Sequence, residues 1–198
     1  RAFILGHIET ARILVANRAD VNKATRSGKT PLIGAVENKK HDVVKWRVEE
    51  VRANVNIADA YGDTPLFLAC ELGKLETARI LVANRADVNK ATASGETPLY
   101  IAAKKGDIDI VKLLVENRAD VDQIVTWNDK TPRDAAREAG HNDVEEWLDE
   151  YKEKRALKEI RALGLSNRVA HNRDRTMTMP VLHNDVMDII HQNLFSKK

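Results

Sequence analysis

The stretch TPLFLACELGKLETARILVANRADVNKAT, residues 64–92, decides the fold of this chain because much of it recurs. Its last seventeen residues occur unchanged at residues 9–25, an offset of 67 positions. Its Thr-Pro start recurs at residues 30–31, 97–98 and 131–132, so the successive spacings are 34, 33 and 34 residues. A unit this short cannot bury its own apolar face, and the period therefore predicts that successive units stack on one another.

Each unit carries the signals of two short helices. Thr is a good helix N-cap and Pro suits the first helical position, so a first helix is predicted to begin at each Thr-Pro pair. Apolar residues at helical spacing, such as Ile108, Val111 and Leu114, predict a second helix. Polar stretches with Tyr61-Gly62 or Ser94-Gly95 at a turn then predict a projecting, hairpin-like loop.

A turn followed by two antiparallel helices, repeated about every 33 residues, resembles the ankyrin repeat. The resemblance implies an all-α solenoid of helix-turn-helix units with hairpin-like loops. We expect an ankyrin-like domain over residues 1–154 and a helical extension over residues 155–198. The expected units are a partial repeat at 1–25, repeats at about 26–59, 60–92 and 93–125, and a C-terminal cap repeat at 126–154. Because residue 1 falls inside a repeat, we expect further repeats before it.

The chain departs from the ankyrin pattern in two columns. The Gly that usually follows the second helix is replaced by Arg18, Arg52, Arg85 and Arg118. A residue other than Gly costs about 1 kcal/mol in the left-handed conformation expected there. These arginines are either a basic ridge for an acidic partner or solvated loop residues copied by duplication. The His that usually follows Thr-Pro-Leu is replaced by Ile33, Phe67, Tyr100 and Arg133.

The repeat at residues 26–59 is predicted to be locally irregular. Lys39 occupies the position of the glycine between the two helices, and Gly34 occupies an apolar core position. Residues 46–53 contain one residue more than the other second helices. The loop at residues 120–131 also has one extra residue, and Asp129 replaces its turn glycine.

The C-terminal part predicts a long helix and an arm. Apolar residues keep helical spacing from about residue 142 to residue 163, and residues 164–180 are predicted to form an extended, basic linker. A short amphipathic helix is predicted at about 184–195, with Val186, Ile189, Ile190 and Leu194 on one face. A helix this short needs a groove, which either this chain's own repeats or a partner protein could provide.

Neither catalytic nor metal chemistry is predicted. The six His and the single Cys show no metal-ligand spacing, and no Gly-rich phosphate loop or catalytic constellation is present, so we expect no cofactor. Cys70 is expected to be a buried thiol, and a lone cysteine favours a reducing intracellular compartment, cytoplasmic or nuclear. A net charge of +2 does not indicate nucleic acid, and no apolar run approaches the ~18 residues that a membrane span needs.

The resemblance implies that a protein partner contacts the loop tips and the exposed faces of the first helices. Four of the nine aromatic residues fall in these columns. For Phe67 and Tyr100, packing against the neighbouring repeat is the alternative. The candidate contact residues are Arg26, Tyr61, Asp63, Phe67, Glu71, Glu96, Tyr100, Lys104, Lys105 and Trp127, with Val186, Ile189, Ile190 and Leu194 from the arm.

These patterns predict a non-catalytic interaction scaffold that binds one protein through its repeats and docks a second surface through its C-terminal arm. Two alternatives stay open. The chain could be a regulatory module of a larger enzyme whose catalytic part lies outside these residues, or a structural subunit of a large assembly. The sequence leaves the identity of the partner and the oligomeric state open.

Overall fold

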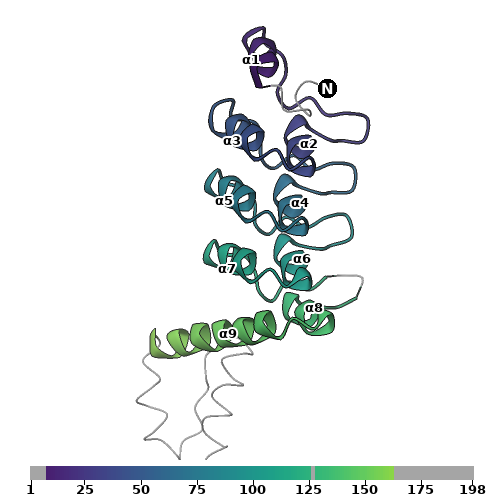
Figure 1. The fold of residues 1–198 in the computed structure, drawn as a ribbon. Coiled ribbons are helices and arrows are strands. Elements are labelled where there is room, and N and C mark those ends of the chain that lie inside the picture. The colour runs from purple at the N-terminus through teal and green to yellow at the C-terminus, as the bar shows by residue number, and fades with distance from the viewer. Residues whose placement is uncertain (1–7, 126–127, 163–198) are drawn as a thin grey trace, which may run out of the picture. The chain divides into compact units, whose positions relative to one another are not determined.

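A computed structural model of the chain describes residues 8–125 and 128–162, and these residues form nine helices (Figure 1). The chain divides after Glu145 into two compact units. The all-α architecture predicted from the sequence is confirmed. The helices are α1 (Ile8–Ala16), α2 (Pro31–Glu37), α3 (His41–Glu49), α4 (Pro65–Glu71), α5 (Leu75–Ala83), α6 (Pro98–Lys105), α7 (Ile108–Glu116), α8 (Pro132–Ala139) and α9 (Asn142–Ala162).

In the first unit, helices pack in two rows (Figure 1). The first helices α2, α4, α6 and α8 contact one another in chain order, and the second helices α3, α5 and α7 form the other row. Each of α2, α4 and α6 also contacts the second helix of its own repeat. The largest buried apolar side chains include Leu66, Leu81, Leu99, Ile110 and Leu114. The predicted stacking of incomplete units is therefore the source of the core.

The Thr-Pro pairs begin the first helices as predicted. The hydroxyl of each Thr accepts a hydrogen bond from the backbone N–H three residues later, at 3.1–3.2 Å. At Thr131 the bond is reciprocal, because its own N–H donates to the carboxylate of Asp134 at 3.0 Å. These bonds satisfy amides that an uncapped helix would leave without partners.

The predicted left-handed backbone is present wherever the chain replaces a glycine of the pattern. Lys39 has a φ of 56° and Asp129 a φ of 53°. The column after the second helices also has positive φ, between 54° and 69°, at Arg18, Arg52, Arg85 and Arg118. Each of these residues adopts a conformation that L-residues disfavour, so stacking of the repeats must offset the strain.

The predicted irregularity of the repeat at residues 26–59 is confirmed at the end of α3. The N–H of Val51 donates to the carbonyl of Trp46, five residues back, so the helix loosens in its last turn. Arg47 on this helix is fully buried, and its guanidinium donates to the carbonyl of Val21 at 2.6 Å. Burial lowers the pKa of Arg47 to about 10, so the side chain stays charged at neutral pH.

Asparagine side chains connect successive repeats. Asn56 accepts a hydrogen bond from the N–H of Asp87 at 2.8 Å and donates to the carbonyl of Arg85 at 3.1 Å. Asn89 makes the same two bonds one repeat later, to the N–H of Asp120 and the carbonyl of Arg118. The carbonyls of Arg85 and Arg118, two of the four positive-φ arginines, are thus held by the preceding repeat.

The long helix predicted from residue 142 to residue 163 is confirmed as α9, which ends at Ala162. Within the second unit, the rings of Trp147 and Tyr151 are stacked, with their centroids 5.6 Å apart. Lys154 pairs with Glu150 at 2.8 Å. The predicted linker and the predicted helix at 184–195 lie outside the described residues.

Candidate protein-binding surface

Backbone hydrogen bonds join the loop tips of neighbouring repeats. The N–H of Ala60 donates to the carbonyl of Ser27 at 3.0 Å, and the N–H of Ala93 donates to the carbonyl of Tyr61 at 2.9 Å. Gly62 permits the second contact, because its φ is 82° and a Cβ there would lie 2.5 Å from the nitrogen of Ala93. The tips therefore present their side chains from a fixed backbone.

Tyr61 stands out on this row of loop tips. Its exposed fraction of 69% is the largest of any large apolar side chain among the described residues. The carboxylate of Asp59 accepts hydrogen bonds from the N–H groups of Tyr61 and Asp63, at 2.9 and 3.1 Å, and so shapes the turn around it. An exposed aromatic side chain on an ordered backbone is typical of residues that anchor a partner.

Charged residues occur in pairs eight positions apart on this side of the stack. The first member precedes a Thr-Pro pair, and the second lies at or near the end of the first helix. Three repeats hold opposite charges at these positions and form ion pairs. These are Lys29 with Glu37 at 2.5 Å, Glu96 with Lys104 at 3.6 Å, and Lys130 with Glu138 at 2.5 Å.

The repeat at residues 60–92 differs, because both of its positions are acidic. Asp63 and Glu71 form no ion pair with any of the described residues. The pKa of Asp63 is raised, first by partial burial and then by the negative charges of Asp59, Glu71 and Glu96. Lys29, which is already paired with Glu37, lowers the pKa of Asp63 only in part, so this portion of the surface carries negative charge without an ion pair of its own.

Most of the predicted contact residues that the structure describes are accessible. Asp63 and Glu96 are half-buried, and the exposed residues are Arg26, Tyr61, Glu71, Lys104 and Lys105. The predicted contacts that lie outside the described residues are Trp127, Val186, Ile189, Ile190 and Leu194.

The structure corrects the expectation for Phe67 and Tyr100. Their side chains are 4% and 3% exposed, so both belong to the core and not to an accessible surface. Tyr100 packs with Val125 and Ala135, and its hydroxyl accepts a hydrogen bond from the side-chain amide of Asn128 at 3.0 Å. The alternative to partner contact is packing against the neighbouring repeat. The structure favours that alternative for Tyr100.

The sequence prediction did not identify Lys29 and Glu37 as an ion pair, and it did not include the accessible Leu72, which follows α4, among the candidate contact residues. Leu72 is 36% exposed. The hydrogen bond that the Lys29 ammonium donates to the carboxylate of Glu37 is the largest factor that raises the pKa of Lys29. The eight-residue spacing of opposite charges is present in the sequence. Whether the two charges form an ion pair, however, depends on how the loop folds back over the first helix.

The described residues also bear on three other kinds of site: a metal site, a membrane-spanning helix and a reactive cysteine. Residues 8–125 and 128–162 hold no group of three or more His, Cys, Asp or Glu side chains that could bind a metal ion. None of the helices in these ranges is both long and apolar enough to cross a membrane. Cys70 is fully buried as predicted, and burial raises the pKa of its thiol, which makes it a poor nucleophile.

Comparison with known proteins agrees with this architecture. A family model described as ankyrin repeats (3 copies) matches residues 1–92 and 87–156. NF-kappa-B inhibitor cactus of Drosophila yakuba and the protein of the same name of Drosophila melanogaster are each 36% identical to the chain over 78 residues. The matched segment is 38% of this chain and 16% of the length of each relative.

Proposed function

Because this chain belongs to the ankyrin-repeat family, we propose that it is a non-catalytic interaction module that binds a protein through its loop tips and first helices. Ankyrin repeats generally mediate protein–protein interaction. The matched relatives are named as NF-kappa-B inhibitors, and a role in acting on another protein is in keeping with such relatives.

One observation supports the choice of this surface. The exposed Tyr61 lies near two acidic residues, Asp63 and Glu71, that form no ion pair within the described residues. In the other three repeats the corresponding charges pair with each other. A partner could supply a Lys or Arg side chain that forms an ion pair with these acidic residues. An apolar patch of the partner, next to that basic side chain, would then cover Tyr61. Complementary charge of this kind favours the correct partner and speeds its association.

Tyr61→Ala is expected to weaken binding of the partner by about tenfold or more, because an aromatic anchor contributes about 2 kcal/mol when a partner buries it. The partner is first recovered by copurification and identified by mass spectrometry, and dissociation constants are then measured by calorimetry. Ile13→Ala is the control, since Ile13 is also highly exposed, at 63%, but lies on α1. Equal losses for both variants, or a loss below about threefold for Tyr61→Ala, would contradict the proposed anchor.

Glu71→Lys tests the charge of the partner. The substitution gives Asp63 an internal ion pair like that of Glu96 with Lys104, and it places a positive charge where we propose that a basic side chain binds. We expect a loss of about tenfold in affinity at low salt and a smaller loss at high salt, because screening weakens the contact. Tighter binding by this variant would show that the partner is acidic at this position.

The finer parts of the proposal stay predictions. They are the docking of a second surface by the C-terminal arm, the division between residues 1–154 and 155–198, and the intracellular compartment.

A further inference from the structure

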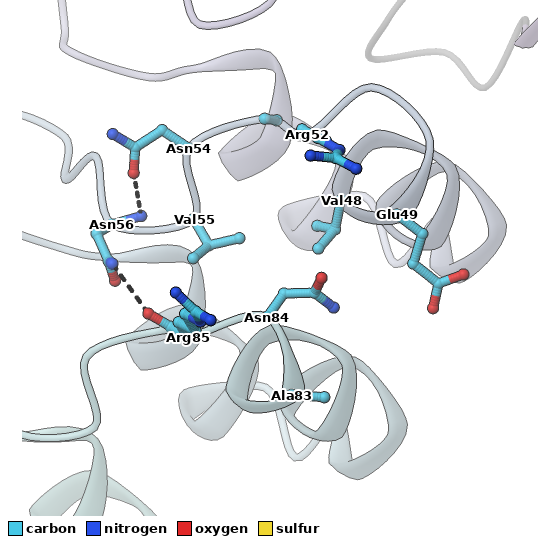
Figure 2. A pocket seen from close by; sticks show the side chains of 10 residues that line it. Val48, Glu49, Arg52, Asn54, Val55, Asn56, Ala83, Asn84 and Arg85 are labelled. Atoms are coloured by element: carbon cyan, nitrogen blue, oxygen red, sulfur yellow. Dashed lines mark hydrogen bonds between the residues drawn. The ribbon is translucent and has the colours of Figure 1, made fainter.

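A groove of about 470 Å³ lies between the C-terminal ends of α3 and α5, on residues that the proposed loop-tip surface does not use (Figure 2). Its volume is within the range of small ligand sites, about 300–1,000 Å³. The lining residues that matter for the argument are Val48, Glu49, Arg52, Val55, Ala83 and Arg85.

One wall of the groove contains the additional residue of the irregular repeat. After α3, the N–H of Ala53 donates to the carbonyl of Arg47, six residues back. After α5, the corresponding N–H of Ala86 donates to the carbonyl of Leu81, only five residues back. The chain therefore makes a wider turn after α3, and Arg52 lies on this turn.

The side-chain amides near the groove already hold the backbone. The side-chain oxygen of Asn54 accepts from the N–H of Asn56 at 2.9 Å, and the side-chain amide of Asn56 donates to the carbonyl of Arg85 at 3.1 Å. The side-chain amide of Asn84 donates to the carbonyl of Ile80 at 2.8 Å. These bonds fix the shape of the groove and leave the two guanidinium groups as its charged donors.

Arg52 and Arg85 are both exposed, and within residues 8–125 and 128–162 neither forms an ion pair with a carboxylate. Figure 2 shows the carboxylate of Glu49 directed away from both guanidinium groups. In the same view, Val48 and Val55 lie between the two arginines. Both valines are nearly fully buried, at 4% and 6% exposed, so they form an apolar floor between two positive charges.

We propose that this groove binds an acidic segment of a protein, with the carboxylate of a Glu or Asp side chain held between Arg52 and Arg85. A guanidinium can form two parallel N–H···O bonds with a carboxylate. The exposed Ala83, with the outer atoms of the two valines, offers an apolar contact to the aliphatic stem of a glutamate, which a bare phosphate ion lacks. The groove therefore selects a negatively charged segment, whereas the surface around Tyr61 selects a positively charged one.

The test uses the full chain with ¹⁵N-labelled arginine and a capped peptide of sequence ELEELE, with the uncharged peptide QLQQLQ as the comparison. We expect the Nε–Hε signals of Arg52 and Arg85 to shift saturably with ELEELE and to stay unchanged with QLQQLQ. The double variant Arg52→Gln/Arg85→Gln is expected to weaken binding of ELEELE by about tenfold or more, because it removes charge-assisted hydrogen bonds.

Arg18→Gln/Arg118→Gln is the matched control. All four arginines have positive φ, and Arg18 lies in the same seventeen-residue sequence as Arg85. This control is expected to change the affinity by less than about twofold, and the signals of Arg18 and Arg118 are expected not to shift. The proposal is overturned if all four signals shift with the same midpoint, if QLQQLQ binds equally well, or if inorganic phosphate produces the same saturation. Any of these results leaves the Tyr61 surface untouched, because its variants alter other residues.

Discussion

Leu81→Ala is expected to lower the free energy of unfolding by about 3 kcal/mol, and Leu14→Ala by about 1 kcal/mol or less. The two leucines occupy the same position of the identical segments at residues 9–25 and 76–92, so their local sequence is the same. Leu81 is fully buried on α5, which packs against α4 and contacts both α3 and α7. Leu14 is 39% exposed on α1, so its truncation removes less buried surface and leaves less of a cavity.

Urea denaturation followed by circular dichroism measures both effects, and an unchanged m-value would show that the comparison is valid for this repeat protein. Ala11 and Ala78 are 1% and 0% exposed, so the small residue three positions before each leucine is buried in both segments. Equal losses for the two variants would mean that Leu14 is as well covered as Leu81, against the structure. A difference of about 2 kcal/mol would show that stacking, not local sequence, supplies most of the stability.

The elements of the fold could be predicted because their signals are local. A Thr hydroxyl reaches an amide three residues away, and Pro fixes its own φ, so each Thr-Pro pair determines the start of a helix without tertiary information. The positive φ of Arg85 was predictable from its place in the repeat, although its residue type disfavours that conformation. The length of α9 was predictable because its apolar spacing continues beyond a single repeat.

Whether an aromatic residue of a first helix is buried or exposed could not be predicted from local signals. A first helix contacts its own second helix and the first helices of both neighbours, so a bulky residue in its first turn can face either solvent or core. The burial of Tyr100 depends on Asn128, which lies 28 residues later in a loop with an extra residue. Arg47 was missed for a similar reason, since the carbonyl that accepts its hydrogen bond belongs to Val21 in the preceding repeat. Arginine is rarely buried, and no local signal marks this exception.

The candidate surface was predicted in part. The columns for loop tips and first helices correctly placed Tyr61, Glu71 and Lys104 in accessible positions. The contrast between three neutralised repeats and one acidic repeat emerged only from the ion-pair distances. The groove at Arg52 and Arg85 likewise needed coordinates, because an added residue in the sequence does not reveal whether a helix continues or a turn widens.

Gly62→Ala is expected to destabilise the protein by about 3 kcal/mol. The φ of Gly62 is 82°, and placing any Cβ in this conformation costs about 1 kcal/mol. The added Cβ would also lie 2.5 Å from the nitrogen of Ala93 and 3.0 Å from the carbonyl carbon of Thr92, so the two loops must separate. Their separation breaks the hydrogen bond from Ala93 to the carbonyl of Tyr61, which leaves a backbone donor without its partner and adds about 1–3 kcal/mol.

Gly140→Ala is the matched control, because Gly140 has a φ of 78° and a Cβ there would meet nothing within 4 Å. It is expected to cost about 1 kcal/mol, so the difference between the two variants isolates the contact between loop tips. Unfolding in urea gives both values, and calorimetry with the protein partner gives a second measurement. Since the same bond holds Tyr61 in place, Gly62→Ala should also weaken binding, whereas Gly140→Ala should not. If both variants lose the same stability, the loops tolerate separation, and an ordered backbone can no longer explain why Tyr61 would act as an anchor.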